Sequence, residues 1–169
     1  MRQLILTVIG DDRAGLVAAL ADVVQAHGGT WEFSEMAELA GTFAGVVQVA
    51  IPAENQTRFI DVVGRLDLDL EVRIRAAQVP EPARSDLRIE LIADDQPGLV
   101  QQVSSTLAEL GVGISRLETS TQPAPMAGGQ LFVLRANAVL PPDVSRDRVR
   151  VALENLSQEL MVDLSLAQI

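Results

Sequence analysis

The spacing of apolar residues along the chain predicts an alternation of strands and helices. Residues 3–9 form an apolar run rich in β-branched side chains, which is typical of a strand. Apolar positions then recur at helical spacing, at Leu16, Leu20, Val23, Val24 and His27. Gly28 and Gly29 predict the end of this helix, because glycine adopts the left-handed conformation that commonly closes a helix.

Residues 30–76 complete the pattern. Strands are expected at 30–39 and 43–51, on either side of a turn at Ala40-Gly41, and Leu70–Ala76 alternates as a half-buried strand does. Between them a helix opens at Pro52, and its apolar face carries Phe59, Val62, Val63 and Leu66. The order βαββαβ is that of the ferredoxin-like α+β fold, an antiparallel sheet with both helices on one face.

The same pattern occurs twice in the chain. Residues 4–17 align without gaps on residues 87–100, and seven of the fourteen positions are identical. These are Leu4/Leu87, Ile9/Ile92, Asp11/Asp94, Asp12/Asp95, Gly15/Gly98, Leu16/Leu99 and Val17/Val100. The second copy then gains residues around 121–129, a stretch rich in proline and glycine that predicts a mobile loop. We therefore expect two ferredoxin-like modules in tandem.

Pro80 and Pro82 mark the boundary between the two copies. They lie in a short polar stretch that is typical of a fairly stiff linker. We place module 1 at residues 1–79, the linker at 80–85 and module 2 at 86–169. Each module alone leaves sheet edges uncovered, and exposed edges favour pairing with another chain. A homo-oligomer, such as a homodimer, is therefore expected.

The composition narrows the classes of partner. The 169 residues carry 13 basic and 23 acidic side chains, which gives a formal net charge of −10. Direct binding of DNA or RNA needs a basic face and is not expected. No apolar stretch reaches the roughly 20 residues of a membrane span, so no membrane contact is expected. The N-terminus lacks the apolar region and cleavage site of a signal peptide, which predicts a cytoplasmic protein.

Groups suited to catalysis or metal binding are scarce. The chain has no cysteine and one histidine, His27, at the end of the first predicted helix. A histidine there interacts favourably with the helix C-terminus, so a structural role is expected. A metal site or a general base would need partners that this sequence does not supply. We therefore expect a protein that is not an enzyme and has no cofactor.

The turn between the first strand and first helix of each copy carries the most informative sequence. It reads Gly-Asp-Asp-Arg-Ala-Gly-Leu at 10–16 and Ala-Asp-Asp-Gln-Pro-Gly-Leu at 93–99. With the βαββαβ order and the module size, these turns make the chain resemble the ACT domain family, whose turn is often Asp-x-Pro-Gly. The second copy fits better, because the first has Ala14 where the family favours proline. The two-module arrangement is similar to the glycine cleavage system transcriptional repressor group.

This resemblance implies a regulatory function. ACT domains typically bind small ligands, often amino acids, where two modules meet, and the repressor group is thought to act through a protein partner. The resemblance thus predicts binding of a small amino acid such as glycine, and modulation of a transcriptional regulator or another protein. The predicted ligand-binding residues are Asp11, Asp12, Gly15, Leu16, Asp94, Asp95, Gly98 and Leu99.

The chemistry of the turn agrees with a ligand role and also with a purely local one. The N–H groups at a helix N-terminus suit a ligand carboxylate, and Gly15 and Gly98 would permit close approach. However, an aspartate ahead of a helix is commonly its N-cap, and Pro97 is favourable near the first helical position. For any single aspartate we favour capping, whereas ligand contact by the loop as a whole stays an open alternative.

Trp31 and Phe33 begin the second predicted strand of the first copy. Strict alternation places both on one face of the sheet, with Glu32 on the other. Packing in the core is the expected role for such large aromatic side chains, and a place in a ligand pocket is the alternative.

Two other functions compete with amino-acid binding. The chain could be a structural interaction module that binds no small molecule and works through its exposed sheet edges. It could also be a detached regulatory half that once accompanied an enzyme, an interpretation that rests on the fold family alone.

Overall fold

The structure is a computed structural model, and it describes residues 1–66, 70–76, 86–124, 128–160 and 163–167. The chain forms two compact units, Met1–Pro80 and Glu81–Ile169. The predicted linker, residues 80–85, lies outside the described residues.

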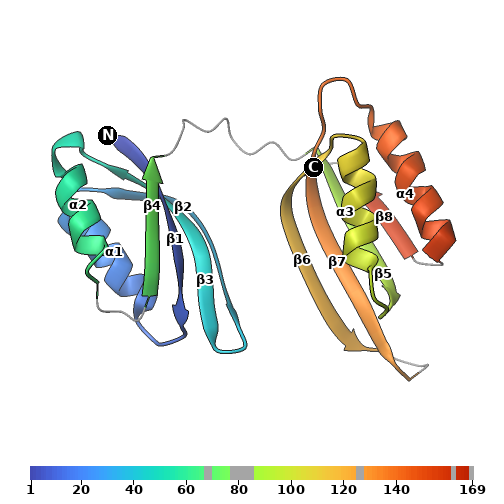
Figure 1. Cartoon of the computed structure of the whole chain (residues 1–169), viewed down its shortest axis with the longest axis horizontal. Helices are drawn as coiled ribbons and strands as arrows, with labels where there is room; N and C mark the ends of the chain where they lie inside the picture. The colour runs from blue at the N-terminus through green and yellow to red at the C-terminus, as the bar shows by residue number, and fades with distance from the viewer. Residues whose placement is uncertain (67–69, 77–85, 125–127, 161–162, 168–169) are drawn as a thin grey trace. The chain divides into compact units, whose positions relative to one another are not determined.

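The first unit contains an antiparallel sheet in the strand order β2-β3-β1-β4. Its elements follow one another as expected from the apolar pattern (Figure 1). They are β1 (Arg2–Asp11), α1 (Leu16–Ala26), β2 (Thr30–Leu39), β3 (Thr42–Ile51), the 3-10 helix η1 (Ala53–Asn55), α2 (Gln56–Val63) and β4 (Leu70–Ala76). Helix α1 ends where the glycines predict, since Gly28 has a positive φ of 68° and donates its N–H to the Gln25 carbonyl at 2.9 Å.

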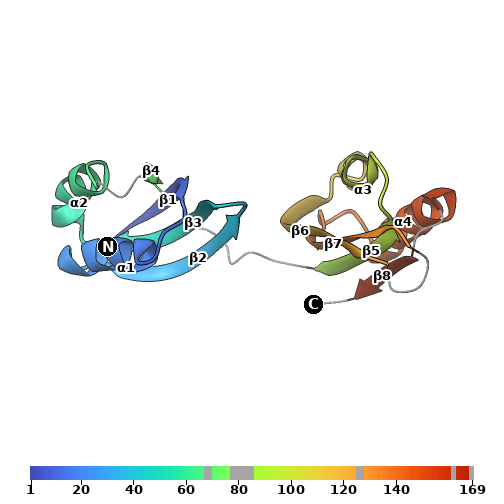
Figure 2. The same cartoon turned by 90° about the horizontal axis from the view of Figure 1, so that it is seen from below.

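The second unit repeats this arrangement with the strand order β6-β7-β5-β8, again antiparallel. Its elements are β5 (Leu87–Asp94), α3 (Leu99–Glu109), β6 (Gly113–Pro123), β7 (Gln130–Val139), α4 (Arg146–Leu160) and β8 (Asp163–Ala167). In each unit the two α-helices cover the same face of the sheet (Figure 2). We call the other face the open face. The predicted fold, two ferredoxin-like βαββαβ modules in tandem, is confirmed.

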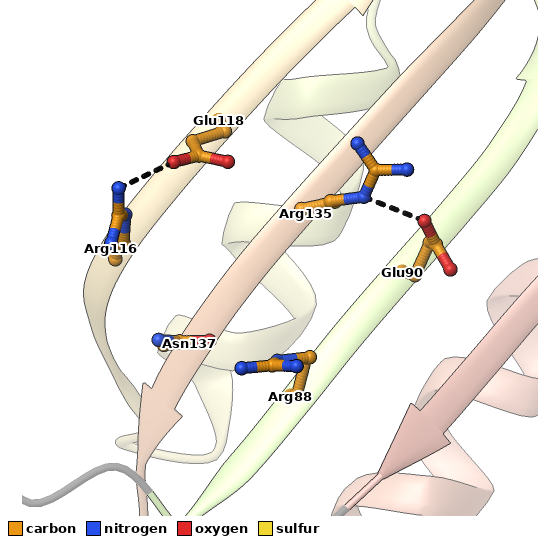
Figure 3. A pocket seen from close by; sticks show the side chains of 6 residues that line it. All are labelled: Arg88, Glu90, Arg116, Glu118, Arg135 and Asn137. Atoms are coloured by element: carbon orange, nitrogen blue, oxygen red, sulfur yellow. Dashed lines mark hydrogen bonds and ion pairs between the residues drawn. The ribbon is translucent and has the colours of Figure 1, made fainter. Parts of the chain in front are cut away.

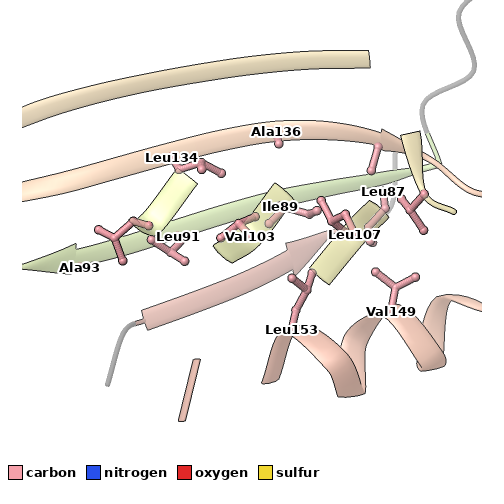
Figure 4. Packing of buried hydrophobic residues seen from close by; sticks show 13 residues of the cluster. Leu87, Ile89, Leu91, Ala93, Val103, Leu107, Leu134, Ala136, Val149 and Leu153 are labelled. Carbon is pink, nitrogen blue, oxygen red and sulfur yellow. The ribbon is translucent and has the colours of Figure 1, made fainter. Parts of the chain in front are cut away.

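Each module has its own core between its sheet and its helices. In β1 every second side chain is buried, at Leu4, Leu6 and Val8, and these pack with Phe59 of α2. In β5 the equivalent buried residues are Leu87, Ile89, Leu91 and Ala93. Figure 4 shows the helix residues that these face, namely Val103 and Leu107 of α3 and Val149 and Leu153 of α4. Each such large apolar side chain contributes about 1.5–3 kcal/mol on burial, so this alternation fixes which face of each sheet meets the helices.

The predicted Pro/Gly loop is shorter than the sequence indicates. Residues 121–123 belong to β6 and pair with β7, where Thr121 lies opposite Phe132 and Pro123 opposite Gln130. Beyond the strand, Ala124 donates its N–H to the Gly129 carbonyl at 3.1 Å, and residues 125–127 lie outside the described residues. The extra residues of the second module therefore lengthen the β6–β7 hairpin as well as its turn.

The prediction that Trp31 and Phe33 share one face is wrong. The register of β2 against β3 shifts between these residues, so that Trp31 lies opposite Val49 whereas Phe33 lies opposite Gln48. Trp31 accordingly packs against the core, and Phe33 is 57% exposed on the open face. A β-bulge inserts one extra residue, here Glu32, and thereby reverses the alternation that the prediction assumed.

Candidate functional site

The predicted ligand-binding residues lie at one end of each module, in the loop that joins β1 to α1 or β5 to α3. Asp11 and Asp94 are the last residues of their strands, and Asp12 and Asp95 follow directly. All four aspartates are exposed. The structure thus brings the predicted residues of each module together at the start of its first helix.

The capping interpretation of these aspartates is wrong. The N-cap residues are Gly15, with φ 97° and ψ −3°, and Gly98, with φ 96° and ψ −5°, and no side chain caps either helix. The strand must turn sharply into the helix, and the turn uses a left-handed residue that glycine adopts without steric cost. Pro97 precedes this N-cap instead of opening the helix.

Each loop is held against the neighbouring hairpin by one backbone hydrogen bond. The Asp12 N–H donates to the Gly41 carbonyl at 2.9 Å, and the Asp95 N–H donates to the Gln130 carbonyl at 2.9 Å. The matching bonds show that the two loops have the same backbone path. The side chains of Leu16 and Leu99, at 3% and 2% exposed, point into the cores. A ligand at these two positions would therefore meet their backbone and not their side chains.

Each loop leads into a helix whose first backbone N–H groups precede the helical hydrogen bonds. The first helical hydrogen bonds run from Ala19 to Gly15 and from Gln102 to Gly98, both at 2.9 Å. The N–H groups ahead of them have no acceptor within their helix, and the helix dipole gives this end a partial positive charge. Such an end suits a carboxylate, and the exposed aspartates beside it suit an ammonium group.

Sequence reasoning missed a pocket on the open face of the second module. The pocket has a volume of about 300 Å³ and is lined by Arg88, Glu90, Arg116, Glu118, Arg135 and Asn137. Figure 3 shows these side chains standing on β5, β6 and β7, with helix α3 behind the sheet. We call it the charged pocket. The one signal in the sequence was the alternation of Arg88 and Glu90 with the apolar residues of β5.

Two ion pairs order the charged pocket. Arg135 donates from Nε to Glu90 Oε1 at 2.7 Å, and Arg116 donates from Nη2 to Glu118 Oε1 at 2.7 Å (Figure 3). Both pairs are partly exposed to solvent, so they contribute little to stability. Their effect is to orient two guanidinium groups over the sheet.

His27 has the structural role expected from its position. Its Nδ1 lies 2.8 Å from the Val23 carbonyl, and its ring packs edge-on against Phe59 with the centroids 5.6 Å apart. Within the described ranges, no group of three or more His, Cys, Asp or Glu side chains is placed to hold a metal ion. None of the described helices is long and apolar enough to cross a membrane.

Comparison with known proteins relates this fold to a family. Residues 2–76 match the model of the ACT domain. The chain superposes over 99% of its length on 98% of an unknown protein from Galdieria sulphuraria, with a TM-score of 0.87 and 28% identity. It also superposes over 99% of its length on 97% of a proposed glycine cleavage system transcriptional repressor, with a TM-score of 0.74 and 20% identity. No curated protein sequence matches the chain.

Proposed function

We propose that this chain, which has a two-module ACT fold and matches the ACT domain at residues 2–76, is a non-enzymatic regulatory protein. It binds a small amino acid, such as glycine, at its strand-to-helix loops. Binding shifts the population of its conformations and so changes its contact with a protein partner, such as a transcriptional regulator. ACT domains are regulatory modules that bind small ligands, which gives the proposal its basis.

The observation that carries the proposal is the loop geometry that recurs in the two modules. The N-cap glycines have backbone angles that agree within two degrees, 97° and −3° against 96° and −5°. In both loops, uncapped helical N–H groups stand beside two exposed aspartates. A zwitterionic amino acid carries the complementary pair of charges, a carboxylate for the N–H groups and an ammonium for an aspartate.

The charge of the chain supports a protein partner over nucleic acid. With a formal net charge of −10, the chain as a whole would repel a phosphate backbone. The proposal therefore has the chain act on a regulator and not on DNA. We also propose that the protein is cytoplasmic. We propose a homo-oligomeric state because each module has uncovered sheet edges.

A thermal-unfolding screen against the twenty amino acids at millimolar concentration tests the proposal. A ligand that binds the native state stabilises it by RT ln(1 + [L]/Kd), about 2.7 kcal/mol at a hundredfold excess over Kd. We expect one or two small amino acids to raise the midpoint of unfolding selectively. If all twenty amino acids shift the midpoint equally, or if none shifts it, and calorimetry confirms this, amino-acid sensing would be excluded.

Matched variants then identify the loop that binds. Asp95→Asn in the second module and Asp12→Asn in the first remove one charge each from equivalent exposed positions. We expect Asp95→Asn to weaken binding more than Asp12→Asn, because the second loop has the proline that the family favours. Equal, unchanged affinity in both variants would show that these two carboxylates take no part.

A second candidate function is supported by the open face of the first module. Ile9, Phe33 and Val46 are exposed there at 46%, 57% and 42%, and they lie on neighbouring strands of one sheet. Exposed apolar patches commonly mark protein contacts. A structural interaction module would lose its association when Phe33 is replaced by serine and would not respond to amino acids.

A further inference from the structure

Six outward-facing residues of the second sheet form two rows across β6, β7 and β5. In each row the central residue belongs to β7, and it lies opposite one residue of β6 and one residue of β5. The rows are Arg116–Asn137–Arg88 and Glu118–Arg135–Glu90 (Figure 3). We call the first the cationic row and the second the acidic row.

The acidic row is satisfied within the protein. Glu90 accepts from Arg135, which is in the same row, and Glu118 accepts from Arg116 of the neighbouring row, both at 2.7 Å. Each carboxylate thus has a guanidinium partner, so this row does not need a ligand cation.

In the cationic row Arg116 is paired with Glu118, whereas in the part of the chain that the structure describes Arg88 and the Asn137 amide have no anionic partner. Among the residues that the structure describes, no hydrogen bond or ion pair involves the side chain of Arg88 or the side-chain amide of Asn137. Arg88 and Arg116 stand on either side of Asn137, about 10 Å apart at their Cα atoms by the spacing of strands. The Arg88 and Arg116 guanidinium groups and the Asn137 amide N–H₂ lie in one row across three strands, and they are donor types that bind an oxyanion.

In the first module, the position equivalent to Asn137 is hydrogen-bonded to a carboxylate of the same chain. The residue equivalent to Asn137 is Gln48, which lies between Phe33 and Ile5 in the same register. Gln48 Nε2 donates to Glu32 Oε2 at 2.8 Å, and Glu32 is the residue inserted at the β2 bulge. In the first module, therefore, the central amide binds a carboxylate that the chain itself supplies.

The second module has the same bulge without the carboxylate. Its inserted residue is Ser115, whose hydroxyl donates to the backbone carbonyl of Asn137 at 3.1 Å. The Asn137 side chain keeps its donors, and arginines replace Phe33 and Ile5 on either side. The second module thus gains two cations where it loses an internal anion.

We infer that the cationic row binds a small ligand through a carboxylate or phosphate group, held between Arg88 and Arg116 above the Asn137 amide. The pocket volume of about 300 Å³ admits a small molecule. The site is separate from the loop at the end of β5, because Arg88 lies near the opposite end of that strand and Asn137 of β7 lies opposite Arg88. The inference therefore does not depend on amino-acid binding at the loops.

Titration of the full chain with inorganic phosphate and with acetate, followed by NMR, tests the site. We expect saturable shifts of the Asn137 side-chain amide and the Arg88 Nε–H group with at least one of the two anions. Saturation by phosphate alone would specify a phosphorylated ligand, and saturation by acetate would specify a carboxylate ligand. Shifts that never saturate with either anion would overturn the inference.

Three variants and a control give the test its specificity. Arg88→Gln should weaken anion binding at least tenfold, while Arg150→Gln, which removes the same charge from an exposed position on α4, should change it less than twofold. Ser115→Glu should abolish binding by supplying the carboxylate of the first module, whereas the neutral Ser115→Gln should not. All three positions are exposed, so each variant should keep the fold, which thermal unfolding can verify.

Equal loss of binding in Arg88→Gln and Arg150→Gln would overturn the site in favour of general charge attraction. Anion-induced shifts confined to the amides at the start of α1 and α3 would also overturn it. That last result would agree with ligand binding at the loops, so the failure of this inference is distinguishable from the failure of the proposed function.

Discussion

The two modules share a backbone and a core but differ on their open faces. Leu4, Leu6 and Val8 in β1 have apolar buried counterparts at the same places in β5. On the other side of the same strands, Ile5 and Thr7 of the first module correspond to Arg88 and Glu90 of the second. The first open face exposes the apolar side chains of Ile9, Phe33 and Val46, whereas the second carries five charged groups in a single pocket.

The difference shows which positions the fold constrains. Inward positions of β1 and β5 meet the helices, where a polar side chain would lose its water without gaining a partner. Outward positions meet solvent, so they could diverge after the sequence was duplicated. New binding properties can therefore arise on the open face without any change in the core.

The largest expected loss of stability comes from creating a cavity in the core of the first module. Phe59→Ala should destabilise the first module by about 3–5 kcal/mol, because a fully buried ring leaves a cavity and loses its contact with His27. Urea unfolding followed by the fluorescence of Trp31, the single tryptophan of the chain, measures this loss of stability.

In the second module, Leu153→Ala should lower the free energy of unfolding by about 2–5 kcal/mol, measured by hydrogen exchange of the β5 and β7 amides. A cost below about 1 kcal/mol at either site would contradict the core assignment.

The next effect should be nearly equal in the two modules. Gly15→Ala and Gly98→Ala should each cost about 1–2 kcal/mol, because both residues have positive φ and the added Cβ disfavours that conformation. Gly98→Ala should cost slightly more, since its Cβ would lie 3.3 Å from Gln102 Nε2, whereas that of Gly15 would contact nothing. Thermal unfolding of each variant measures both costs. A neutral substitution at one site alone would mean that the loops differ in conformation.

A smaller effect should appear at the bulges. Glu32→Ala removes the acceptor of two amide hydrogen bonds, from Gln48 at 2.8 Å and Gln3 at 3.2 Å, and should cost about 1 kcal/mol. Ser115→Ala removes a single exposed bond and should cost less. Denaturant midpoints of the two variants check the order, and a larger cost for Ser115→Ala would contradict the comparison of the two faces.

The smallest effect is expected in the acidic row. Glu90→Gln should lower the stability of the second module by about 0.2–1 kcal/mol, because its ion pair with Arg135 is partly exposed to solvent and screened by salt. The difference from the unmodified chain should shrink as sodium chloride is raised from 0.05 to about 0.5 M. A cost that is insensitive to salt would show that Glu90 acts through packing and not through its charge.

Much of the fold was predictable from the pattern of apolar residues within each strand and helix. The alternation in β1 and β5 and the helical spacing from Leu16 to Val24 depend on residues close together in the sequence, and the duplication confirmed each pattern against the other. Trp31 and Phe33 were assigned wrongly because a bulge at Glu32 leaves no mark in the apolar pattern. Long-range register decided the outcome there.

The candidate sites were predictable to different degrees. Both loops stood out because Asp-Asp and Gly-Leu recur at fixed spacing, but the capping role expected for the aspartates was wrong, since a left-handed glycine takes the N-cap position. The cationic row could not be predicted. Arg88, Arg116 and Asn137 are distant in sequence, and only the pairing of three strands places them side by side.

Whether these loops bind a small amino acid is tested most directly by NMR titration of isotopically labelled protein with the amino acids identified by thermal screening. We expect saturable shifts of the amides of Leu99, Val100 and Gln101, or of their counterparts Leu16, Val17 and Ala18, with one or two small amino acids. Absence of such shifts at millimolar concentration, with all twenty amino acids, would contradict amino-acid binding at the loops.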